Sequence, residues 1–412
     1  MPNTSLPIDI SAVINSLIAQ GAGANLAATD LSSTITVAEV SRIFGYERIT
    51  GALSEVIGRT LIAIRPYDNY SFRNIETDSQ VYGMMKRKIS YYSSNFQTDE
   101  SWNYTAASGD GYNLKDGVSI DMYKIHKQYP LEMTYSGNKV LEKVVTRFLY
   151  QYRVAFQDLA SFNQFVQGLV IEVNNSIQRM KESRNRAIVL NFIGGLYNTG
   201  TGRSKVNLTA EFNKKFGTTY TSAELRTTHL KEFSEYIASR IKYDADMMEK
   251  ETDLFHLTPS KTDDSGNKLQ LLRHTPKAEQ RLMLLAPFMY DIEKFVLPEI
   301  FHDGYLRMEN YEAIPYWQSA EAGKEGSINV TPNQLKTSNN TTEKGKAVTT
   351  PYVIGLLYDR PACVSSFRLE DTIPTPYNAA GAYYNTYYHF ANDFQNDFTE
   401  NGILYYMEDA AA

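Results

Sequence analysis

The sequence contains one cysteine, Cys363, among its 412 residues. A single thiol cannot form a disulfide within the chain, and it cannot supply a multi-cysteine zinc or iron–sulfur site. No local signature of a reactive thiol surrounds it, so we expect Cys363 to be free and buried. Such low cysteine usage favours synthesis inside the cell.

The chain also has no excess of positive charge and no long hydrophobic run. Its formal net charge is −6, so no global basic field favours nucleic acid or anionic lipid, and any DNA contact must be local. Residues 282–290 form the most apolar run, which is far too short to span a bilayer. Residues 1–17 lack the basic region that precedes the apolar run of a signal peptide. We therefore expect no membrane partner.

Motifs for catalysis and cofactor binding are missing as well. Residues 195–205 (GLYNTGTGRSK) come nearest to a phosphate-binding loop, but Thr201 stands where the lysine belongs and a helical pattern precedes it, so a helix end and turn is the better interpretation. No G-x-S-x-G motif and no H-E-x-x-H motif occurs. The sequence therefore predicts no enzyme, no cofactor and no metal site, with an active site assembled from distant residues as the open alternative. The histidines available to such a site are His126, His229, His256, His274, His302 and His389.

Tyrosine, by contrast, is abundant, with 30 tyrosines beside 19 phenylalanines. Its side chain combines a large apolar ring with a hydroxyl group that tolerates water. Such residues suit surfaces that are exposed at one stage and buried at another. The composition therefore favours a protein with large contact areas.

A long amphipathic helix is predicted at residues 161–193. Ser161 and Gln164 have the spacing of a capping box, and the Gly194-Gly195 pair is expected to end the helix. Its roughly eight turns far exceed the roughly three turns of an average helix, so we expect a strut whose apolar stripe packs on a sheet of its own chain. The expected stripe is Phe162, Val166, Leu169, Val173, Ile177, Met180, Arg184, Ala187 and Asn191, and the remaining surface includes Glu172, Asn174, Asn175, Gln178, Lys181, Glu182 and Asn185.

Residues 68–143 differ from the rest because two extended runs flank an irregular polar stretch. The runs occupy residues 81–93 and 127–135, and residues 97–117 between them are rich in Gly, Asp, Asn and Ser. We interpret the region as a long two-stranded excursion. An isolated hairpin is barely stable in water, so it must lie on its own body or on a neighbouring chain.

The excursion carries two groups of residues that we expect to contact other subunits. Aromatic rings cluster at its tip, where exposure to water would leave their apolar area unused. A compact basic cluster in its first strand fits an acidic neighbour or phosphates; alternatively, it is a charged edge that discourages wrong strand pairing. The two groups are Trp102, Tyr104 and Tyr112 at the tip, and Lys86, Arg87 and Lys88 in the strand.

Helices and strands are dispersed along the remaining chain, which indicates an α+β fold rather than regular βαβ winding. Thr221 and Glu224 repeat the capping-box spacing at the start of a second helix, whose core face is Leu230, Phe233, Ile237 and Ile241. The other expected elements are a helix at 37–57, a strand at 60–65, a connector at 197–221, a buried strand at 280–290, a short helix at 292–301, a surface loop at 321–350, and strands at 353–358 and 403–407.

The order of these elements resembles that of the major capsid proteins of tailed bacteriophages, which have the Hong Kong 97 fold. The C-terminal region carries most of the resemblance, in residues 353–360 (VIGLLYDR), 383–390 (YYNTYYHF) and 397–404 (DFTENGIL). Residues 280–301 are similar to the central domain of these proteins. Capsid proteins of small short-tailed phages of the phi29 type, and those of gut phages, come closest.

The resemblance implies a domain arrangement along the chain. The expected domains are an N-terminal arm at 1–58, an extended loop with flanking strands at 59–145, a peripheral domain at 146–220 that contains the helix 161–193, an axial domain at 221–350, and a C-terminal segment at 351–412 that returns to the body.

It also implies a function. Hexamers and pentamers of this chain would self-assemble into an icosahedral or prolate shell around a double-stranded DNA genome, first in the host cytoplasm and then as the virion capsid. The implied partners are a separate scaffolding protein, a portal protein at one vertex, and packaged DNA by weak non-specific contact. The alternatives are the shell protein of a non-viral encapsulating compartment and a tyrosine-rich binding module of a tail or surface adhesin.

Overall fold

The computed structural model describes residues 71–77, 86–93, 123, 127–135, 138–148, 159–201, 203–263, 266, 268–291, 311–349 and 351–409. Several expected features lie outside these residues: the N-terminal arm at 1–58, the strand at 60–65, the helix at 292–301, and the hairpin tip with Trp102, Tyr104 and Tyr112. The described residues form two compact units.

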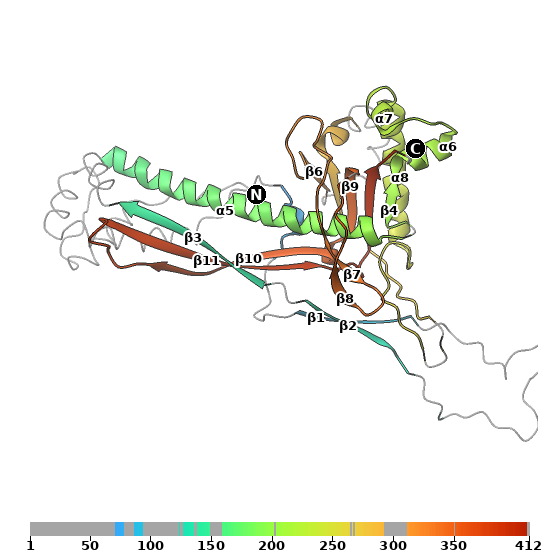
Figure 1. Cartoon of the computed structure of the whole chain (residues 1–412), viewed down its shortest axis with the longest axis horizontal. Coiled ribbons are helices and arrows are strands. Elements are labelled where there is room, and N and C mark those ends of the chain that lie inside the picture. Colours follow the sequence, from blue (N-terminus) through green and yellow to red (C-terminus); the bar gives the residue numbers. More distant parts are fainter. Residues whose placement is uncertain are drawn as a thin grey trace, which may run out of the picture. The chain divides into compact units, whose positions relative to one another are not determined.

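The first unit contains residues 71–77, 138–148, 159–189 and 364–395. Its sheet has three strands in the order β10 (Cys363–Pro374), β11 (Tyr383–Asn396) and β3 (Asn138–Phe148). Strands β11 and β3 pair antiparallel, from Tyr383 opposite Phe148 to Asp393 opposite Asn138. The long helix α5 (Leu159–Thr199) runs along this sheet (Figure 1). A short 3-10 helix, η2 (Arg73–Ile75), completes the unit.

The apolar stripe of α5 packs on this sheet, as expected from the sequence. Val173 of the helix is 3% exposed and forms a buried cluster with Tyr388 and Phe390 of β11. Period-two alternation along β3 and period-3.6 spacing along α5 bring apolar side chains of both elements to the same layer. The partly buried members of this cluster are Leu141, Val145, Ile177 and Met180.

The predicted end of α5 is wrong. The helix begins at Leu159, before Ser161, and continues through Gly194 and Gly195 to Thr199. A Cβ on Gly194 would lie 2.9 Å from Cγ1 of Val330, and a Cβ on Gly195 would overlap the ring of Phe398. The two glycines therefore permit close packing in the middle of a buried turn, where a side chain would not fit.

The predicted stripe also fails near the end of α5. Ala187 is exposed, whereas Asn185, expected on the polar surface, is fully buried. The Asn185 side-chain amide donates to the carbonyl oxygen of Phe72 and to the Glu76 carboxylate, at 3.2 and 2.7 Å. From residue 188 onward the helix is buried on most sides, in Ile188, Val189, Leu190, Phe192, Ile193 and Leu196.

The second unit is built on a five-stranded mixed sheet. Its strands, in spatial order, are β4 (Lys205–Asn207), β12 (Gly402–Met407), β9 (Tyr352–Asp359), β5 (Gln280–Leu285) and β6 (Tyr311–Ile314). Strand β9 pairs antiparallel with both β12 and β5, and the two outer pairings are parallel. All six residues of β12 are buried. The strands expected at 353–358 and 403–407 are thereby confirmed.

Other expectations for this unit need correction. The run expected as a strand at 280–290 turns helical at 286, and the expected connector at 197–221 contains β4 and helix α6 (Leu208–Phe216). The expected surface loop at 321–350 holds a hairpin of β7 (Asn333–Lys336) and β8 (Thr341–Lys344), with Leu335 buried. Short strands with polar outer faces carry too few apolar residues to be recognised in sequence.

The second capping box is confirmed at the start of α7 (Ser222–Thr227), where the side chains and backbones of Thr221 and Glu224 bond reciprocally. The helix expected to follow it is two helices, because α8 (Leu230–Met248) starts anew after His229. Phe233, Ile237 and Ile241 form the buried face of α8, as expected.

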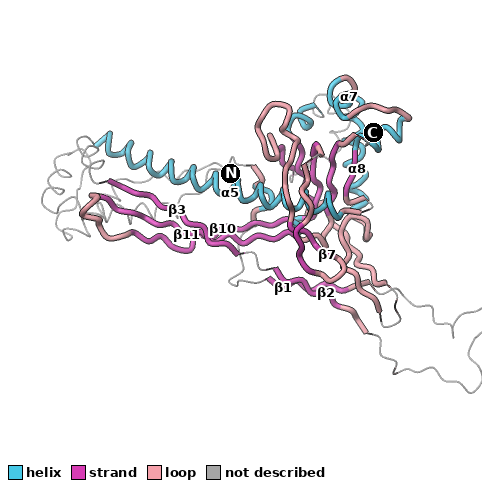
Figure 2. The backbone as a smooth tube through the Cα atoms, viewed as in Figure 1, coloured by secondary structure: helices cyan, strands magenta, loops and turns pink. Residues whose placement is uncertain are grey.

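The two-stranded excursion is confirmed at its base. Strands β1 (Lys86–Tyr91) and β2 (Pro130–Tyr135) pair antiparallel, from Lys86 opposite Tyr135 to Tyr91 opposite Pro130 (Figure 2). Helices combined with mostly antiparallel strands agree with the expected α+β class. Among the helices that the structure describes, none is long and apolar enough to cross a membrane.

Candidate functional site

The candidate site is the base of the β1–β2 hairpin, which carries the basic cluster. Alternate residues of β1 point to opposite faces of a strand. Ser90 is buried and Lys88 is partly buried, whereas Ile89 and Tyr91 are 51% and 61% exposed. One face of the hairpin base therefore packs on the rest of the second unit, to which the hairpin belongs, and the other face is presented to solvent.

Apolar and backbone contacts fasten the inner face. Tyr92 and Leu131, at the ends of the two strands, form a buried cluster with Leu271. The Tyr92 hydroxyl donates to the carbonyl oxygen of Pro259 at 3.0 Å. The backbone N–H of Ser93 donates to the carbonyl oxygen of Gln270 at 2.8 Å.

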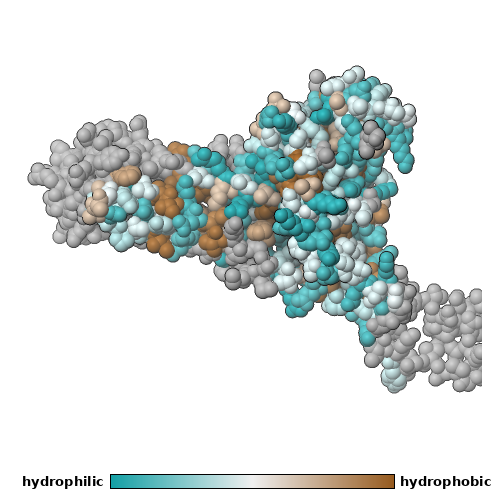
Figure 3. Space-filling view, in the orientation of Figure 1, coloured by the Kyte–Doolittle hydropathy of each residue, from teal (hydrophilic) through white to brown (hydrophobic). Residues whose placement is uncertain are grey.

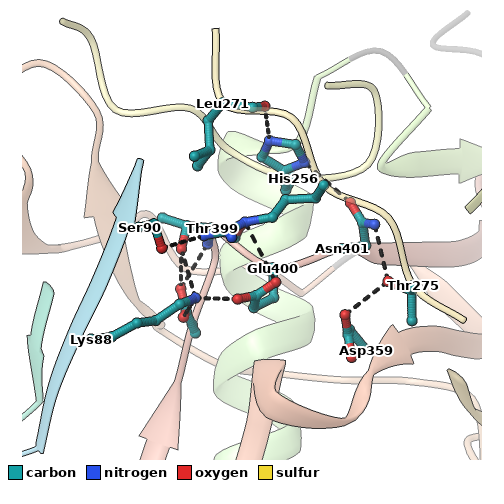
Figure 4. A network of polar contacts seen from close by, with 11 residues as sticks. Lys88, Ser90, His256, Leu271, Thr275, Asp359, Thr399, Glu400 and Asn401 are labelled. Atoms are coloured by element: carbon teal, nitrogen blue, oxygen red, sulfur yellow. Dashed lines mark hydrogen bonds and ion pairs between the residues drawn. The ribbon is translucent and has the colours of Figure 1, made fainter. Parts of the chain in front are cut away.

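Lys88 adds a buried ionic contact at the centre of this face. Its Nζ lies 2.5 Å from Oδ2 of Asp397. It also binds the Glu400 carboxylate (Figure 4). The Lys88 side chain is 24% exposed, and the Asp397 side chain is fully buried. The acidic partners of Lys88 thus belong to its own chain, whereas the sequence predicted contact of the basic cluster with an acidic neighbour or with phosphates.

The Asp397 carboxylate is held in its charged form. Burial would raise the pKa of Asp397, but the charge and hydrogen bond of Lys88, together with the Thr399 hydroxyl, outweigh it and lower that pKa below its usual range. Oδ1 of Asp397 accepts from the Thr399 backbone N–H and hydroxyl at 2.9 and 2.6 Å. The carboxylate therefore both fixes the turn that carries it and neutralises Lys88.

Arg273 joins the strand to the same turn. It donates from Nε to the carbonyl oxygen of Thr399 at 3.1 Å and from Nη2 to the Ser90 hydroxyl at 2.8 Å. Its Nε also lies 3.6 Å from Oε2 of Glu400. Lys88 of β1 and Arg273, which lies between α8 and β5, thus both contact the carboxylate-bearing segment that precedes β12.

A second polar network adjoins this one (Figure 4). Nε2 of His256 lies 2.8 Å from the carbonyl oxygen of Leu271, and Nδ1 lies 3.1 Å from Oδ1 of Asn401. The Asn401 amide donates to the Thr275 hydroxyl at 3.0 Å, and that hydroxyl donates to Asp359 at 2.8 Å. These side chains come from four separate segments. They meet beside the turn at 397–401, called here the anchoring turn because its carboxylates bind Lys88 of the hairpin.

The remaining candidate residues of the hairpin lie at its base or outside the described residues. Arg87 faces solvent and pairs with Glu132 of β2, Nε to Oε1 at 2.5 Å, with side chains 62% and 49% exposed. Lys86, at the first position of β1, is partly exposed. The three aromatic residues at the tip lie outside the described part of the chain.

No pattern in the sequence pointed to Asp397, Glu400, Arg273 and His256 as members of the site. One local signal was available, because an Asp followed two residues later by Thr, as in 397–399, is typical of a turn in which the carboxylate caps the backbone. Nothing local connects that turn to Lys88, since the two lie 309 residues apart.

The other motifs considered in the sequence have structural roles. Lys205, in the loop compared with a phosphate site, donates from Nζ to the carbonyl oxygen of Tyr197 at 2.8 Å and thereby caps the end of α5. Cys363 is free and buried as expected; its Sγ lies 3.3 Å from Oδ1 of Asn396, and burial raises its pKa. Among the described residues, no group of three or more His, Cys, Asp and Glu side chains could hold a metal ion.

Comparison with known proteins rests on structure. No protein-family model matches the sequence, and no curated protein matches it. A chain in the capsid structure of Staphylococcus phage Andhra is similar, with a TM-score of 0.52 and 11% identity over 84% of this chain and 86% of that one. A chain in the structure of head fiber and inner core protein gp22 of native bacteriophage P68 has a TM-score of 0.53 and 10% identity, covering 84% and 89%. The chain therefore shares its fold with chains of these two phage particles.

Proposed function

We propose that this chain is a major capsid protein of a tailed bacteriophage, which self-assembles into the shell around a double-stranded DNA genome. The observation that carries the proposal is the shared fold, which extends over 84% of the chain in the phage Andhra capsid structure. These neighbours favour a structural protein rather than an enzyme. They do not favour a compartment shell or an adhesin module.

Exposed apolar side chains support a subunit that is completed by its neighbours. Val140 and Val144 of β3 are 62% and 39% exposed, and Ile373 of β10 is 48% exposed. Apolar surface is visible among the hydrophilic side chains over the β3–β11 region (Figure 3). Large exposed apolar side chains gathered on one sheet support a contact area with another protein. A closed shell would cover it in every subunit.

The finer fold assignment belongs to the same proposal. We interpret α5 as the spine helix of a Hong Kong 97-like peripheral domain, the β1–β2 hairpin as the base of its extended loop, and the five-stranded sheet as the axial domain. The proposed boundary between loop and peripheral domain, at 145, falls inside β3 (Asn138–Phe148). A short-tailed phage of the phi29 type is the proposed origin.

The proposed partners follow from this assignment. Subunits would form hexamers and pentamers in the host cytoplasm around a separate scaffolding protein, with a portal protein at one vertex. The formal net charge of −6 supports only weak, non-specific contact with the packaged DNA, because an acidic surface does not release counterions from phosphates.

Contacts between subunits are proposed at the hairpin. The tip residues Trp102, Tyr104 and Tyr112 would bury their rings against a neighbour. Arg87 would contribute from the solvent face of the base, and Lys86 from its partly exposed position at the start of β1. The exposed Ile89 and Tyr91 side chains on that same face support this arrangement. Lys88 would contribute indirectly, since its ammonium group already binds two carboxylates of its own chain.

Electron microscopy of the chain, expressed with its scaffolding protein, tests the proposed function. Closed shells are the expected result, and soluble monomers under the same conditions would contradict it. The cargo separates the two kinds of shell, because packaged DNA supports a phage capsid whereas a packaged enzyme identifies a compartment.

A loop variant tests the role of the hairpin. Replacing residues 106–116 with a short Gly/Ser turn should leave the subunit folded, as measured by circular dichroism and thermal melting, and should impair the sedimentation of assembled particles. A full-length variant with Trp102, Tyr104 and Tyr112 changed to Ser tests the rings separately from the loop length. Normal shells from both variants, or loss of the monomer fold, would contradict an inter-subunit role.

A further inference from the structure

The polar chain beside the hairpin anchor has an unusual donor and acceptor count. It runs from the Leu271 carbonyl through His256, Asn401 and Thr275 to the Asp359 carboxyl (Figure 4). The four side chains belong to residues that are between 0% and 7% exposed. Buried polar groups need partners within the protein, so the protons of this chain can be counted.

The count starts at Leu271, whose carbonyl oxygen only accepts. Nε2 of His256 must therefore carry a proton, and in a neutral ring Nδ1 is then an acceptor. It then needs the NH₂ group of Asn401, so the amide must turn over from its orientation in the structure, where Oδ1 faces Nδ1 and the NH₂ group donates to Thr275. The Thr275 hydroxyl must then donate to the amide oxygen, so its own lone pair needs a donor. The other partner that the structure gives this hydroxyl is Asp359, which can supply a donor when its carboxyl group is protonated.

The alternative arrangement begins with a charged ring. An imidazolium donates from Nδ1 to the amide oxygen of Asn401, the amide NH₂ donates to Thr275, and the hydroxyl donates to an Asp359 carboxylate. Both arrangements satisfy every link, and both hold the same number of protons. A third state combines a neutral His256 with an ionised Asp359 and holds one proton fewer than either arrangement. In that state, one of the hydrogen-bond positions along the network brings two acceptors together.

We propose that His256 and Asp359 share a single proton through Asn401 and Thr275, and that loss of this proton weakens the turn that anchors the hairpin base. When the proton leaves to solvent, the pair changes from net neutral to net negative and one hydrogen bond of the chain is broken. The two groups therefore titrate as a unit rather than separately.

The surroundings of Asp359 favour keeping the proton at that end. Burial raises the pKa of Asp359 to about 6; the hydrogen bond from Thr275 lowers it, nearby Glu400 and Glu279 raise it, and Lys88 lowers it. A carboxyl group that titrates near pH 6 changes its charge within the physiological range.

The surroundings of His256 favour a neutral ring. Burial lowers the pKa of His256, its hydrogen bonds to Asn401 and Leu271 raise it, Arg273 lowers it, and Glu400 raises it. Burial acts in the same direction at both ends, because it disfavours each charged form. Burial therefore favours the arrangement with a neutral ring and a protonated carboxyl, whereas the orientation of Asn401 in the structure is that of the arrangement with a charged ring.

The chain is coupled to the hairpin through shared segments. Asn401 ends the run 397–401, in which Asp397 and Glu400 bind Lys88. Thr275 lies two residues after Arg273, which binds Ser90. A broken link at Asn401 thus acts on the same short turn that holds β1. This coupling is a property of the single subunit and does not depend on shell assembly.

Hydrogen exchange measured by mass spectrometry tests the proposal on the full-length chain. Rates are compared at pH 5.5 and pH 8 after correction for intrinsic exchange. Peptides covering 86–93 and 397–407 should exchange about tenfold faster at pH 8 in the wild type, because a buried hydrogen bond is lost. Asp359→Asn, whose amide donates permanently to Thr275, should keep the protection of the low-pH state at both values. Asp253→Asn, which removes an exposed carboxylate of the same unit, should behave as wild type.

A second measurement uses only the wild-type protein and so does not depend on the folding of a variant. In wild-type protein with ¹⁵N-labelled histidine, the chemical shifts of the His256 ring nitrogens should change with pH. Their midpoint should equal the pH midpoint at which the protection from hydrogen exchange is lost. Equal protection at both pH values, a pH response that persists in Asp359→Asn, or a His256 midpoint far from that of the exchange would each overturn the proposal.

Discussion

Gly195 of α5 lies directly against the ring of Phe398, so close that a methyl group on Gly195 would overlap it. Phe398 is 5% exposed, and its ring stacks on Phe192 of the same helix with 5.1 Å between centroids. Phe398 immediately follows Asp397, the carboxylate that binds Lys88. Because Gly195 has no side chain, Phe398 of the anchoring turn can pack directly against the backbone of α5.

Gly195→Ala should destabilise the chain although alanine is the better helix former. Alanine gains about 1 kcal/mol of helix propensity, but an overpacked core residue costs about 1–3 kcal/mol, and the buried ring has little room to move. We expect a lower urea midpoint than wild type. The double variant Gly195→Ala with Phe398→Leu should recover part of the loss, since the smaller side chain vacates the space. A midpoint raised by Gly195→Ala alone would contradict this packing.

Lys88→Met should cost about 3–5 kcal/mol of unfolding free energy, because it leaves the buried Asp397 carboxylate without its cation. Lys86→Met is the matched control, two residues away on the same strand and partly exposed, and should change stability by less than about 0.5 kcal/mol. The comparison is made by urea denaturation at pH 7. Equal effects of the two substitutions would mean that Lys88 is an ordinary surface cation.

The pH dependence of these variants should differ in sign. In the wild type the pKa of Asp397 is lowered, so the stability that this carboxylate contributes is complete above its ordinary pKa of about 3.9 and is lost as pH falls through the folded value. In Lys88→Met, burial becomes the dominant influence and raises that pKa. The contribution of Asp397 should then fall as pH rises above about 4. The difference in stability between Lys88→Met and Lys86→Met, measured from pH 3 to pH 7, should therefore grow with pH.

The sequence predicted those elements whose signal is local. Strand β12 is an uninterrupted apolar run, and the capping box at Thr221 and Glu224 is a four-residue pattern. Strand β3 was missed because charged residues occupy it, for example Lys143 and Arg147, and its partners on β11 lie some 240 residues away. The two glycines in α5 were misinterpreted because a close approach by Phe398 cannot be seen in a helical pattern.

In the candidate site, too, local patterns were recognised in the sequence and long-range contacts were not. Lys86, Arg87 and Lys88 were recognised together, but only the strand register decides that Arg87 faces solvent while Lys88 points inward. The acidic partners come from the turn before β12, which the sequence offered only as part of a resemblance. An ion pair between residues far apart in the sequence produces no recognisable pattern in either segment.

The packing of α5 on the β3–β11 sheet can be tested within one turn of the helix. Val173 is 3% exposed and contacts Tyr388 and Phe390, whereas Ile171, two residues earlier, is 59% exposed. Both are β-branched aliphatic residues in the same helix. Substituting Asp at each position therefore introduces the same charge and similar helix propensity into two different environments.

Val173→Asp should remove most of the folded protein, because a carboxylate without a partner at this position loses hydration and the contacts of the valine, at a cost of several kcal/mol. Ile171→Asp should lower the free energy of unfolding by less than about 1 kcal/mol, since its side chain stays in water. Soluble yield, far-ultraviolet circular dichroism and the urea midpoint measure the difference. Similar stability of the two variants would mean that the buried stripe of α5 does not hold this sheet, and a large loss in Ile171→Asp alone would place the sheet on the opposite side of the helix.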